Sequence, residues 1–251
     1  MTRIEVQIYE IQDPVEAEAV IGLGVDRIGS VILSEEHWKI PAIRKAVFIA
    51  REAGVKHSLI PLFQTKHTLF QVIAYYNPHI IHFCEALTDE QGSVMPHEPL
   101  VELQGAIKEH FPDIKIMRTI PVGLPERSRG IPTIEIAGRF EGASDLFLTD
   151  TSIGSEPVSG FIGITGRTGD WAVARQLVES TAVPVILAGG LSPTNVYDAV
   201  MAVKPFGVDS CTATNVVGMN GKPVRFKKDY DRVEAFVREV RRAERDLSPH
   251  T

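Results

Sequence analysis

Short apolar runs and amphipathic segments alternate along the whole of this 251-residue chain, and this alternation limits the possible folds more than any other feature. The apolar runs predict strands at residues 4–11, 25–33, 55–63, 79–84, 114–122, 145–150, 183–188 and 206–212. The amphipathic segments predict helices at residues 13–24, 41–53, 66–76, 99–110, 132–140, 170–180, 193–203 and 229–244. Strands separated by helices run parallel, so the pattern indicates an α/β fold of eight strand–helix units.

Two architectures accommodate such alternation, and the positions of the glycines distinguish them. A doubly wound open sheet usually has fewer strands and carries a glycine-rich turn after the first one. Here the first predicted strand ends in Tyr9-Glu10-Ile11-Gln12, without glycine, whereas glycines cluster after the sixth, seventh and eighth strands. The loops after the last strands of a (β/α)8 barrel commonly bind phosphate. We therefore expect one (β/α)8 TIM barrel, with a parallel eight-stranded core, to span residues 1–251 as a single domain.

The composition argues against several classes of protein. The net charge of -6 and the pI near 5.8 disfavour a surface for nucleic acid or anionic membranes. The first residues lack the apolar segment of a signal peptide, and no apolar run approaches the roughly 18 residues of a membrane span. Two cysteines, Cys84 and Cys211, cannot form a disulfide framework, so we expect a cytoplasmic protein. No His, Cys or Asp set has metal-ligand spacing, so we expect neither a metal nor a cofactor.

Residues 146–171 (LFLTDTSIGSEPVSGFIGITGRTGDW) concentrate the candidate chemistry of the chain. The sixth predicted strand ends on the carboxylate of Asp150, and the next loop contains Gly163, Gly166 and Gly169 before a helix begins near Trp171. Glycines allow backbone N–H groups to approach an anion closely, and a helix N-terminus adds a positive partial charge. The segment therefore predicts a phosphate site beside an acidic side chain.

Several motifs, in the same order, resemble those of the phosphoribosylanthranilate isomerase family. Residues 188–196 (AGGLSPTNV) are similar to the phosphate motif at the seventh strand of that family, and residues 163–171 to its Gly-Gly-Thr-Gly…Asp-Trp loop. Residues 205–209 and 25–31 match the eighth and second strands. The resemblance implies a barrel of the ribulose-phosphate-binding type with Asp150 as catalytic acid. It also implies a phosphate site formed by Gly163, Thr165, Gly166, Gly189, Gly190, Cys211 and Thr212.

The sequence departs from the family at the ends of its earlier strands. The family's general base is a cysteine in a Lys-Ile-Cys-Gly context, where this sequence reads Gln7-Ile8-Tyr9-Glu10. An arginine expected after the second strand has no clear match in residues 34–39, a loop that contains Trp38. The family's His-Gly pair at the fourth strand is replaced by Cys84-Glu85, and its Ser-Ser-Gly at the eighth by Cys211-Thr212-Ala213. The phosphate half of the site is therefore kept, whereas the half that holds and deprotonates the sugar is rebuilt.

The family reaction, an Amadori rearrangement, needs an acid and a base on opposite sides of one sugar. The acid protonates the ring oxygen to give a Schiff base, and the base then removes the C2 proton. Tyrosine has an ordinary pKa of about 10 and is a poor base at neutral pH, so we expect Glu10 or Cys84 to act in place of Tyr9. Arg118 and Trp38 are candidate substrate contacts, although Glu10 equally suits a salt bridge to Arg118 across the barrel.

Three functions remain open from the sequence. The first is a cofactor-free phosphoribosylanthranilate isomerase-like enzyme of tryptophan biosynthesis. The second is an isomerase, epimerase or lyase for a different sugar phosphate, and the third is a non-catalytic phosphosugar-binding protein. Each takes a small phosphorylated sugar, and we expect a monomer or homodimer that binds neither nucleic acid nor membrane. Arg127 and Arg129 lie in a loop that we expect to be solvated, with one arginine in reach of an anion.

Overall fold

Eight parallel strands close into a barrel in the order of the sequence, and β8 pairs with β1. The structure is a computed structural model that describes residues 3–89, 93–126, 130–154 and 156–247. The strands are β1 (Glu5–Ile8), β2 (Arg27–Ile32), β3 (Lys56–Pro61), β4 (Ile80–Phe83), β5 (Lys115–Gly123), β6 (Leu146–Ser152), β7 (Val185–Leu187) and β8 (Gly207–Ser210). The predicted α/β barrel with a parallel eight-stranded core is confirmed.

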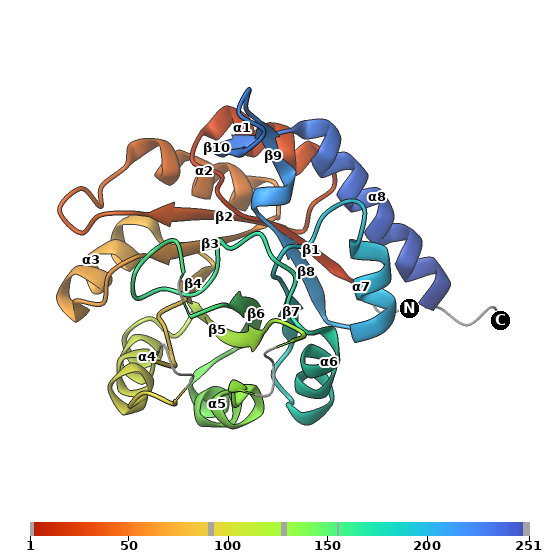
Figure 1. Ribbon diagram of the computed structural model, residues 1–251. Coiled ribbons are helices and arrows are strands. Elements are labelled where there is room, and N and C mark those ends of the chain that lie inside the picture. The colour runs from red at the N-terminus through yellow and green to blue at the C-terminus, as the bar shows by residue number, and fades with distance from the viewer. Residues whose placement is uncertain (1–2, 90–92, 127–129, 155, 248–251) are drawn as a thin grey trace.

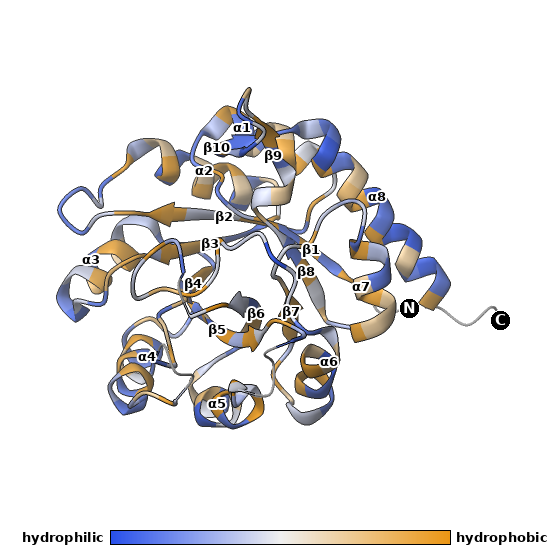
Figure 2. Cartoon of the chain, viewed as in Figure 1, coloured by the Kyte–Doolittle hydropathy of each residue, from blue (hydrophilic) through white to orange (hydrophobic). Residues whose placement is uncertain are grey.

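Helices surround the barrel (Figure 1). They are α1 (Pro14–Gly22), α2 (Pro41–Glu52), α3 (Lys66–Tyr76), α4 (Glu98–His110), α5 (Thr133–Phe140), α6 (Trp171–Ser180), α7 (Val196–Val203) and α8 (Tyr230–Leu247). Asp13 and Asp170 cap α1 and α6 by accepting hydrogen bonds from backbone N–H groups of the first turn. Hydrophilic and hydrophobic residues alternate along α8 in Figure 2, because Val233, Phe236 and Val240 are buried while the opposite side faces solvent. No helix in the described ranges has the length and apolar character needed to cross a membrane.

Side chains of each strand alternate between the barrel interior and the layer beneath the helices. The interior contains one apolar cluster, formed by Tyr9, Ile80, Met117, Leu146, Leu148, Ile186 and Ala188. The outer layer contains larger clusters, such as the one that joins Val6, Ile8 and Phe236. Neighbouring residues within a strand therefore face different environments.

A hairpin between β8 and α8 has no counterpart in the predicted pattern. After a 3-10 turn (η3, Thr212–Thr214), the chain forms the antiparallel strands β9 (Asn215–Val217) and β10 (Pro223–Lys228). These strands are short and only two of their residues are buried, so they lack the apolar periodicity that reveals a strand in a sequence. The hairpin nevertheless brings residues far along the chain over the carboxyl end of the barrel.

The helix α7 begins at Val196, three residues later than the predicted start at position 193. The side chain of Asn195 accepts a hydrogen bond from the backbone N–H of Ser192 (2.8 Å) and donates one to the carbonyl of Gly190 (3.1 Å). These two hydrogen bonds close residues 190–195 into a turn. The Asn195 side chain thereby pairs with backbone groups of this segment in a non-helical conformation, and the helix begins only after it. The loop after β7 is thereby held in a defined shape.

Candidate active site

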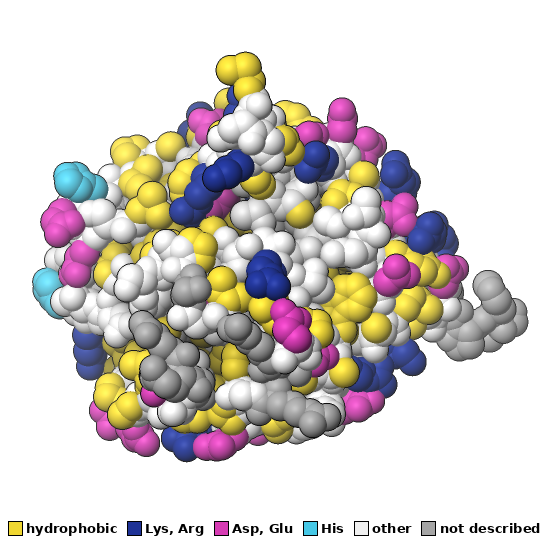
Figure 3. Space-filling model, viewed as in Figure 1, with side chains coloured by type: hydrophobic (Ala, Val, Ile, Leu, Met, Phe, Trp, Pro, Cys, Tyr) yellow, Lys and Arg dark blue, Asp and Glu magenta, His cyan; other side chains and the backbone are white. Residues whose placement is uncertain are grey.

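A pocket opens at the carboxyl ends of the strands, where barrel enzymes carry their active sites. It encloses about 570 Å³, a volume that includes the open space at its mouth. Figure 3 views this face of the molecule and shows Lys and Arg side chains near its centre. The lining residues are Tyr9, Glu10, Val31, Ile60, Leu62, His82, Cys84, Thr119, Leu148, Asp150, Phe161, Ile162, Ile164, Asp209, Cys211 and Arg225.

Asp150 lies near the end of β6, half-buried at the pocket wall. Its Oδ1 accepts a hydrogen bond from the backbone N–H of Thr151 (2.7 Å), which fixes the carboxylate. A Cβ placed at Gly163 would lie 2.1 Å from Asp150 Oδ2, and Gly163 has a φ of 104°, so only glycine allows this approach. Burial, with a smaller contribution from the charge of Glu156, raises the pKa of Asp150 to about 6 against the opposing effect of the hydrogen bond from Thr151. A carboxyl with this pKa can exchange a proton near neutral pH.

Asp209 on β8 is a second acidic side chain in the same pocket, and it was not among the predicted site residues. It is 6% exposed, and its Oδ1 accepts a hydrogen bond from Gln7 Nε2 at 3.2 Å. Burial raises the pKa of Asp209 to about 8 against the effect of Gln7, and the negative charge of Asp150 adds to the rise. Its place in the Phe-Gly-Val-Asp run at the eighth strand was the available sequence signal.

Tyr9 directly follows β1 and takes part in a buried hydrogen-bonded chain. Its hydroxyl lies 2.6 Å from His82 Nδ1, and His82 Nε2 lies 2.8 Å from Thr119 Oγ1. Burial raises the pKa of Tyr9 well above its ordinary value and lowers the pKa of His82 to about 3. Both side chains are therefore neutral at physiological pH, which disfavours Tyr9 as a general base. His82 also lines the pocket.

Cys84 also lines the pocket, but its thiol is poorly suited to act as a base. The side chain is 7% exposed, and burial raises the pKa of Cys84 far from neutrality, with Glu85 adding to the effect. A thiolate at this position would be an unpaired buried charge. The expectation that Cys84 replaces the family's catalytic cysteine is therefore not supported by its environment.

Glu10 forms an ion pair with Arg225, which reaches it from β10. Arg225 Nε donates to Glu10 Oε1 at 2.7 Å, and Asn215 Nδ2 donates to Oε2 at 3.2 Å. The carboxylate is 1% exposed and has a cation as its partner, so it is not a free base. Glu10 also adopts a φ of 67°, a left-handed conformation that costs a non-glycine residue about 1 kcal/mol or more.

Arg118 does not lie in the pocket, although it was expected to contact substrate. Its neighbour Thr119 faces the interior, so the alternation of β5 turns Arg118 into the layer beneath the helices. Its guanidinium is fully buried, where it lies 2.5 Å from Glu85 Oε2 and donates through Nε to Gln104 Oε1 at 2.8 Å. The expected salt bridge between Glu10 and Arg118 is therefore wrong, because each has a different partner.

Trp38 lies in the loop after β2 but packs away from the pocket. Its ring makes edge contacts with the rings of Tyr75 and Tyr76 on α3, at centroid distances of 5.5 and 6.4 Å. Its carbonyl accepts a hydrogen bond from the Tyr76 hydroxyl at 2.6 Å. The structure therefore gives Trp38 a role in packing this loop against α3 and does not bring it to the other candidate site residues.

The glycine-rich loops after β6, β7 and β8 lie against one another. A Cβ placed at Gly190 would lie 2.6 Å from the carbonyl carbon of Arg167, so the loop after β7 touches the backbone of the loop after β6. A Cβ placed at Gly166 would lie 3.6 Å from Thr212 Oγ1, which brings in the segment after β8. Thr165 Oγ1 accepts from the backbone N–H of Arg167 (3.2 Å) and stabilises the turn. The structure thus brings together the residues expected to bind phosphate.

Cys211, expected to take part in the phosphate site, lines the pocket beside Asp209, and burial raises the pKa of its thiol. In the part of the chain that the structure describes, no group of His, Cys, Asp and Glu side chains is arranged to hold a metal ion. The loop expected to bring Arg127 or Arg129 near an anion lies outside the described residues.

The family model for N-(5'-phosphoribosyl)anthranilate (PRA) isomerase matches residues 108–238. An N-(5'-phosphoribosyl)anthranilate isomerase from Methanocella arvoryzae is 37% identical over 130 residues, which cover 52% of this chain and 52% of that protein. One from Methanothrix thermoacetophila is 32% identical over 243 residues, or 96% of this chain and 99% of that protein. The second alignment includes the rebuilt early strands as well as the phosphate loops.

A solved structure has the same fold. It is a phosphoribosyl anthranilate isomerase in complex with reduced 1-(o-carboxyphenylamino)-1-deoxyribulose 5-phosphate, and it superposes with a TM-score of 0.64 over 95% of this chain and 98% of that one. The sequences are 20% identical, so this likeness concerns the barrel. Together with the matched motifs, the family model and the nearly full-length similarity to the Methanothrix protein show that the chain belongs to the N-(5'-phosphoribosyl)anthranilate isomerase family.

Proposed function

We propose that this protein isomerises N-(5'-phosphoribosyl)anthranilate by an Amadori rearrangement, a step of tryptophan biosynthesis that needs no cofactor. The observation that carries the proposal is the pair of acidic side chains, Asp150 and Asp209, that line one pocket beside the glycine-rich loops. Family membership supports this substrate. The ligand of the solved relative combines a 5-phosphate with a carboxyphenylamino group, and the pocket offers a phosphate side and an apolar side.

Asp150 and Asp209 supply the two proton-transfer groups. With pKa values of about 6 and about 8, the pair holds one proton between these pH values, so an acid and a base are present together. The family resemblance implies that Asp150 is the acid, which protonates the ring oxygen and opens the furanose, and Asp209 then removes the C2 proton of the resulting Schiff base. The pair reacts through the one-proton form that has the proton on Asp150, which is the minor form because Asp209 has the higher pKa. β6 and β8 flank β7 in the barrel, so a sugar bound over β7 meets one carboxyl from each side.

The loops after β6, β7 and β8 hold the phosphate. Glycine backbone N–H groups suit this task, because the absence of a side chain lets the anion approach the main chain. Their mutual contacts support a single site rather than three separate turns. Gly163, Thr165, Gly166, Gly189, Gly190, Cys211 and Thr212 form this site in the proposal.

Growth of a tryptophan auxotroph that lacks this isomerase tests the proposal directly. The wild-type gene is expected to restore growth without tryptophan, and the Asp150→Asn variant is expected to fail. With the purified protein, kcat/KM should be greatest between about pH 6 and about pH 8. Below this range Asp150 gains a proton as well, so both carboxyls are protonated and no base remains, whereas above it Asp209 loses its proton, so both are ionised and no acid remains.

A folded wild-type protein that neither restores growth nor consumes the substrate in vitro would contradict the assigned reaction. Circular dichroism of the purified protein provides the control for folding. A pH profile without an alkaline limb would argue against Asp209 as a partner of Asp150, even if the enzyme is active.

We also propose that the enzyme acts in the cytoplasm as a monomer or a homodimer. The two cysteines support a reducing compartment, since neither Cys84 nor Cys211 forms a disulfide. Sedimentation at micromolar concentration distinguishes the two assemblies, and fractionation of cells that express the protein tests the compartment.

A further inference from the structure

We propose that Arg225 binds the carboxylate on the aryl ring of the substrate and that Glu10 positions its guanidinium for this contact. The inference rests on the proposed function, because it assigns one end of the substrate class given there. It adds a residue from the β9–β10 hairpin to a site otherwise built from the barrel strands and their loops.

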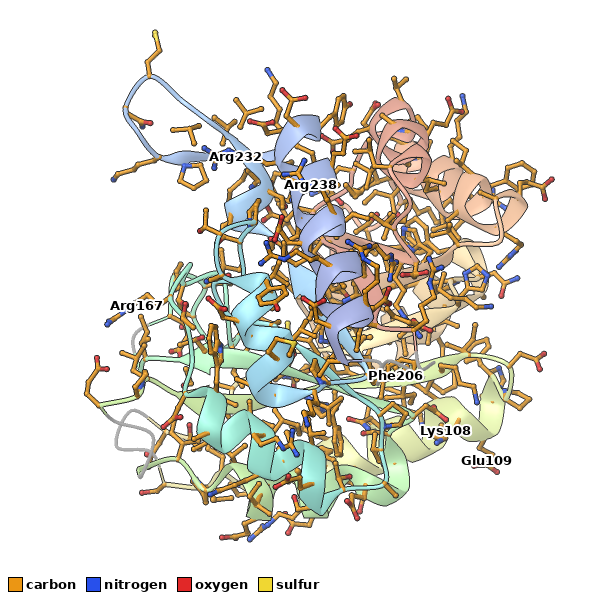
Figure 4. The ribbon with its side chains drawn as sticks, turned by 90° about the vertical axis from the view of Figure 1, so that its right-hand side faces the viewer. Lys108, Glu109, Arg167, Phe206, Arg232 and Arg238 are labelled. Atoms are coloured by element: carbon orange, nitrogen blue, oxygen red, sulfur yellow. The ribbon has the colours of Figure 1, made fainter. Side chains whose placement is uncertain are left out.

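The hairpin holds Arg225 over the pocket from a fixed base. Lys228, at the end of β10, is 4% exposed, and its Nζ donates to the Cys211 carbonyl (2.9 Å) and to Asn215 Oδ1 (2.6 Å). Its backbone N–H donates to Glu16 Oε1 at 2.6 Å, which ties the hairpin to α1. Figure 4 shows the hairpin projecting on the same side of the molecule as Arg167 of the loop after β6. The strand that carries Arg225 is therefore anchored, although the tip is exposed.

Arg225 uses one edge of its guanidinium to contact Glu10. Nε donates to Glu10 Oε1, and Nη2 lies 2.5 Å from the same oxygen but has no acceptor in line with its N–H bonds. Arginine carries five N–H donors in a planar fork. Among the described residues, Arg225 donates a side-chain hydrogen bond only from Nε, to Glu10. The side chain remains 35% exposed and lines the pocket, so the guanidinium can meet a ligand there, while Nη2 itself is buried without a hydrogen-bond acceptor.

The charges of the residues that line the pocket make Arg225 the group that can bind an anionic part of the ligand beside Glu10. Arg225 is the one Lys or Arg among the lining residues in the described part of the chain. The acidic lining residues are Glu10, Asp150 and Asp209. A second anionic group on the substrate would be repelled by these carboxylates unless a cation met it. A planar carboxylate also matches the fork of arginine with two parallel hydrogen bonds.

The position of Arg225 favours the aryl carboxylate over the phosphate. Val31, Ile60 and Leu62, at β2 and β3, form apolar lining on the strands that follow β1 around the barrel. The Gly190–Arg167 contact joins the loops after β6 and β7, the strands opposite β2 and β3 in the closed barrel, whereas the Gly166–Thr212 contact after β8 borders β1. A ligand that spans the mouth therefore has its phosphate at these loops and its aryl group beside Glu10 and Arg225.

Glu10 acts on the substrate through Arg225. Its two oxygens accept from Arg225 Nε, Asn215 Nδ2 and the backbone N–H of Phe226 (3.4 Å), so the carboxylate is surrounded by donors. Glu10 also has a left-handed backbone that glycine would adopt without strain. A carboxylate held at such a position orients the guanidinium, and this makes Glu10 a positioning residue.

Binding of two ligands by three proteins tests the role of Arg225. The first ligand is reduced 1-(o-carboxyphenylamino)-1-deoxyribulose 5-phosphate, and the second is the same compound without the ring carboxylate. Calorimetry on Arg225→Gln should give about 10- to 100-fold weaker binding of the first ligand and about the same binding of the second as in wild type. Lys227→Gln is the matched control, because it removes an exposed charge from the same strand and should change neither affinity.

Steady-state kinetics test the role of Glu10. Glu10→Gln should raise KM about 10-fold and leave kcat nearly unchanged, because it weakens the hold on Arg225 without touching the reacting atoms. A loss of kcat of about 100-fold or more would instead identify Glu10 as the base and overturn its positioning role.

The outcomes separate this inference from the proposed reaction. Equal loss of both ligands in Arg225→Gln would assign Arg225 to the phosphate or to folding and would overturn the inference, as would no loss of either. Failure of the folded wild type to prefer the carboxylate ligand would overturn it as well. Selective loss of the carboxylate ligand supports it, even if the wild type does not turn over N-(5'-phosphoribosyl)anthranilate, in which case only the proposed reaction fails.

Discussion

The two sides of the pocket are built by different means. On the β6–β8 side, backbone segments lie against one another, as at Gly163 beside Asp150 and at Gly190 beside Arg167. On the β1–β5 side, side chains define the surface, as in the hydrogen bond between Tyr9 and His82. A surface made by the main chain tolerates little besides glycine at its close contacts, whereas a surface made by side chains can be rebuilt residue by residue.

The difference explains why the resemblance to the family is uneven along the chain. The glycine motifs of residues 163–171 and 188–196 match because another residue type would disrupt the loops. The tyrosine at position 9 and the Glu10–Arg225 pair represent a different set of side chains on the same barrel. We therefore expect substitutions on the β6–β8 side to impair catalysis or the loops, and substitutions on the other side to alter stability or affinity.

The largest effect is expected at Asp150. Asp150→Asn keeps the size of the side chain but removes the exchangeable proton, so kcat should fall by about 10²- to 10⁴-fold with little change in KM. Asp198→Asn, on an exposed part of α7, is a matched control that should retain nearly full activity. Initial rates of both variants measure the effect. An Asp150→Asn enzyme with more than a tenth of the wild-type kcat would show that Asp150 is not the acid.

The buried pair of Arg118 and Glu85 should give the next largest effect, on stability alone. Arg118→Met leaves the Glu85 carboxylate buried without its cation, which costs about 3–5 kcal/mol of unfolding free energy. Arg139→Met, which breaks an exposed pair with Glu135, should cost less than about 1 kcal/mol. Urea denaturation measures both. If the folded Arg118→Met enzyme showed a much higher KM at an unchanged unfolding free energy, Arg118 would belong to the substrate site after all.

The barrel was predictable from the sequence because its signals are local. The eight apolar runs and the turns between them predict the strands and their order from local sequence alone, without information on long-range contacts. Asp150 and the phosphate glycines were recognisable for the same reason, since each belongs to a short motif in a fixed order.

The rest of the site depends on facts that a linear pattern does not carry. Arg118 and Thr119 are adjacent in the middle of β5, and only the alternation of that strand decides that Thr119 faces the pocket. Glu10 and Arg225 are 215 residues apart and meet through a hairpin with no apolar period. The raised pKa of Asp209 comes from burial, which follows from the packing of the whole barrel.

A methyl group at Gly190 should disturb the loops after β6 and β7 together. Gly190→Ala places a Cβ against the backbone of Arg167 in a left-handed conformation, which costs about 1–3 kcal/mol. We expect the phosphate loops to shift and KM to rise about 10-fold, since the displaced N–H groups hold the substrate less well. Gly138→Ala, at an exposed helical position with open space around it, should instead stabilise the protein by about 0.5–1 kcal/mol. Thermal unfolding and KM are measured on both variants. Equal changes in Tm and KM for the two substitutions would contradict the close contact assigned to Gly190.

The smallest effect is expected at Tyr9, the residue that stands at the position of the family's base. Tyr9→Phe removes the hydroxyl and leaves His82 Nδ1 without its 2.6 Å partner, so the unfolding free energy should fall by about 1–2 kcal/mol. Because both side chains are neutral near pH 7, kcat should stay within about threefold of wild type, far from the 10²- to 10⁴-fold loss of a missing base. Denaturation and initial rates measured on the same preparation separate these effects. If kcat fell by about 10²-fold or more while the unfolding free energy stayed unchanged, Tyr9 would take part in the proton transfer. The β1–β5 side of the pocket would then contribute a catalytic group and not only its surface.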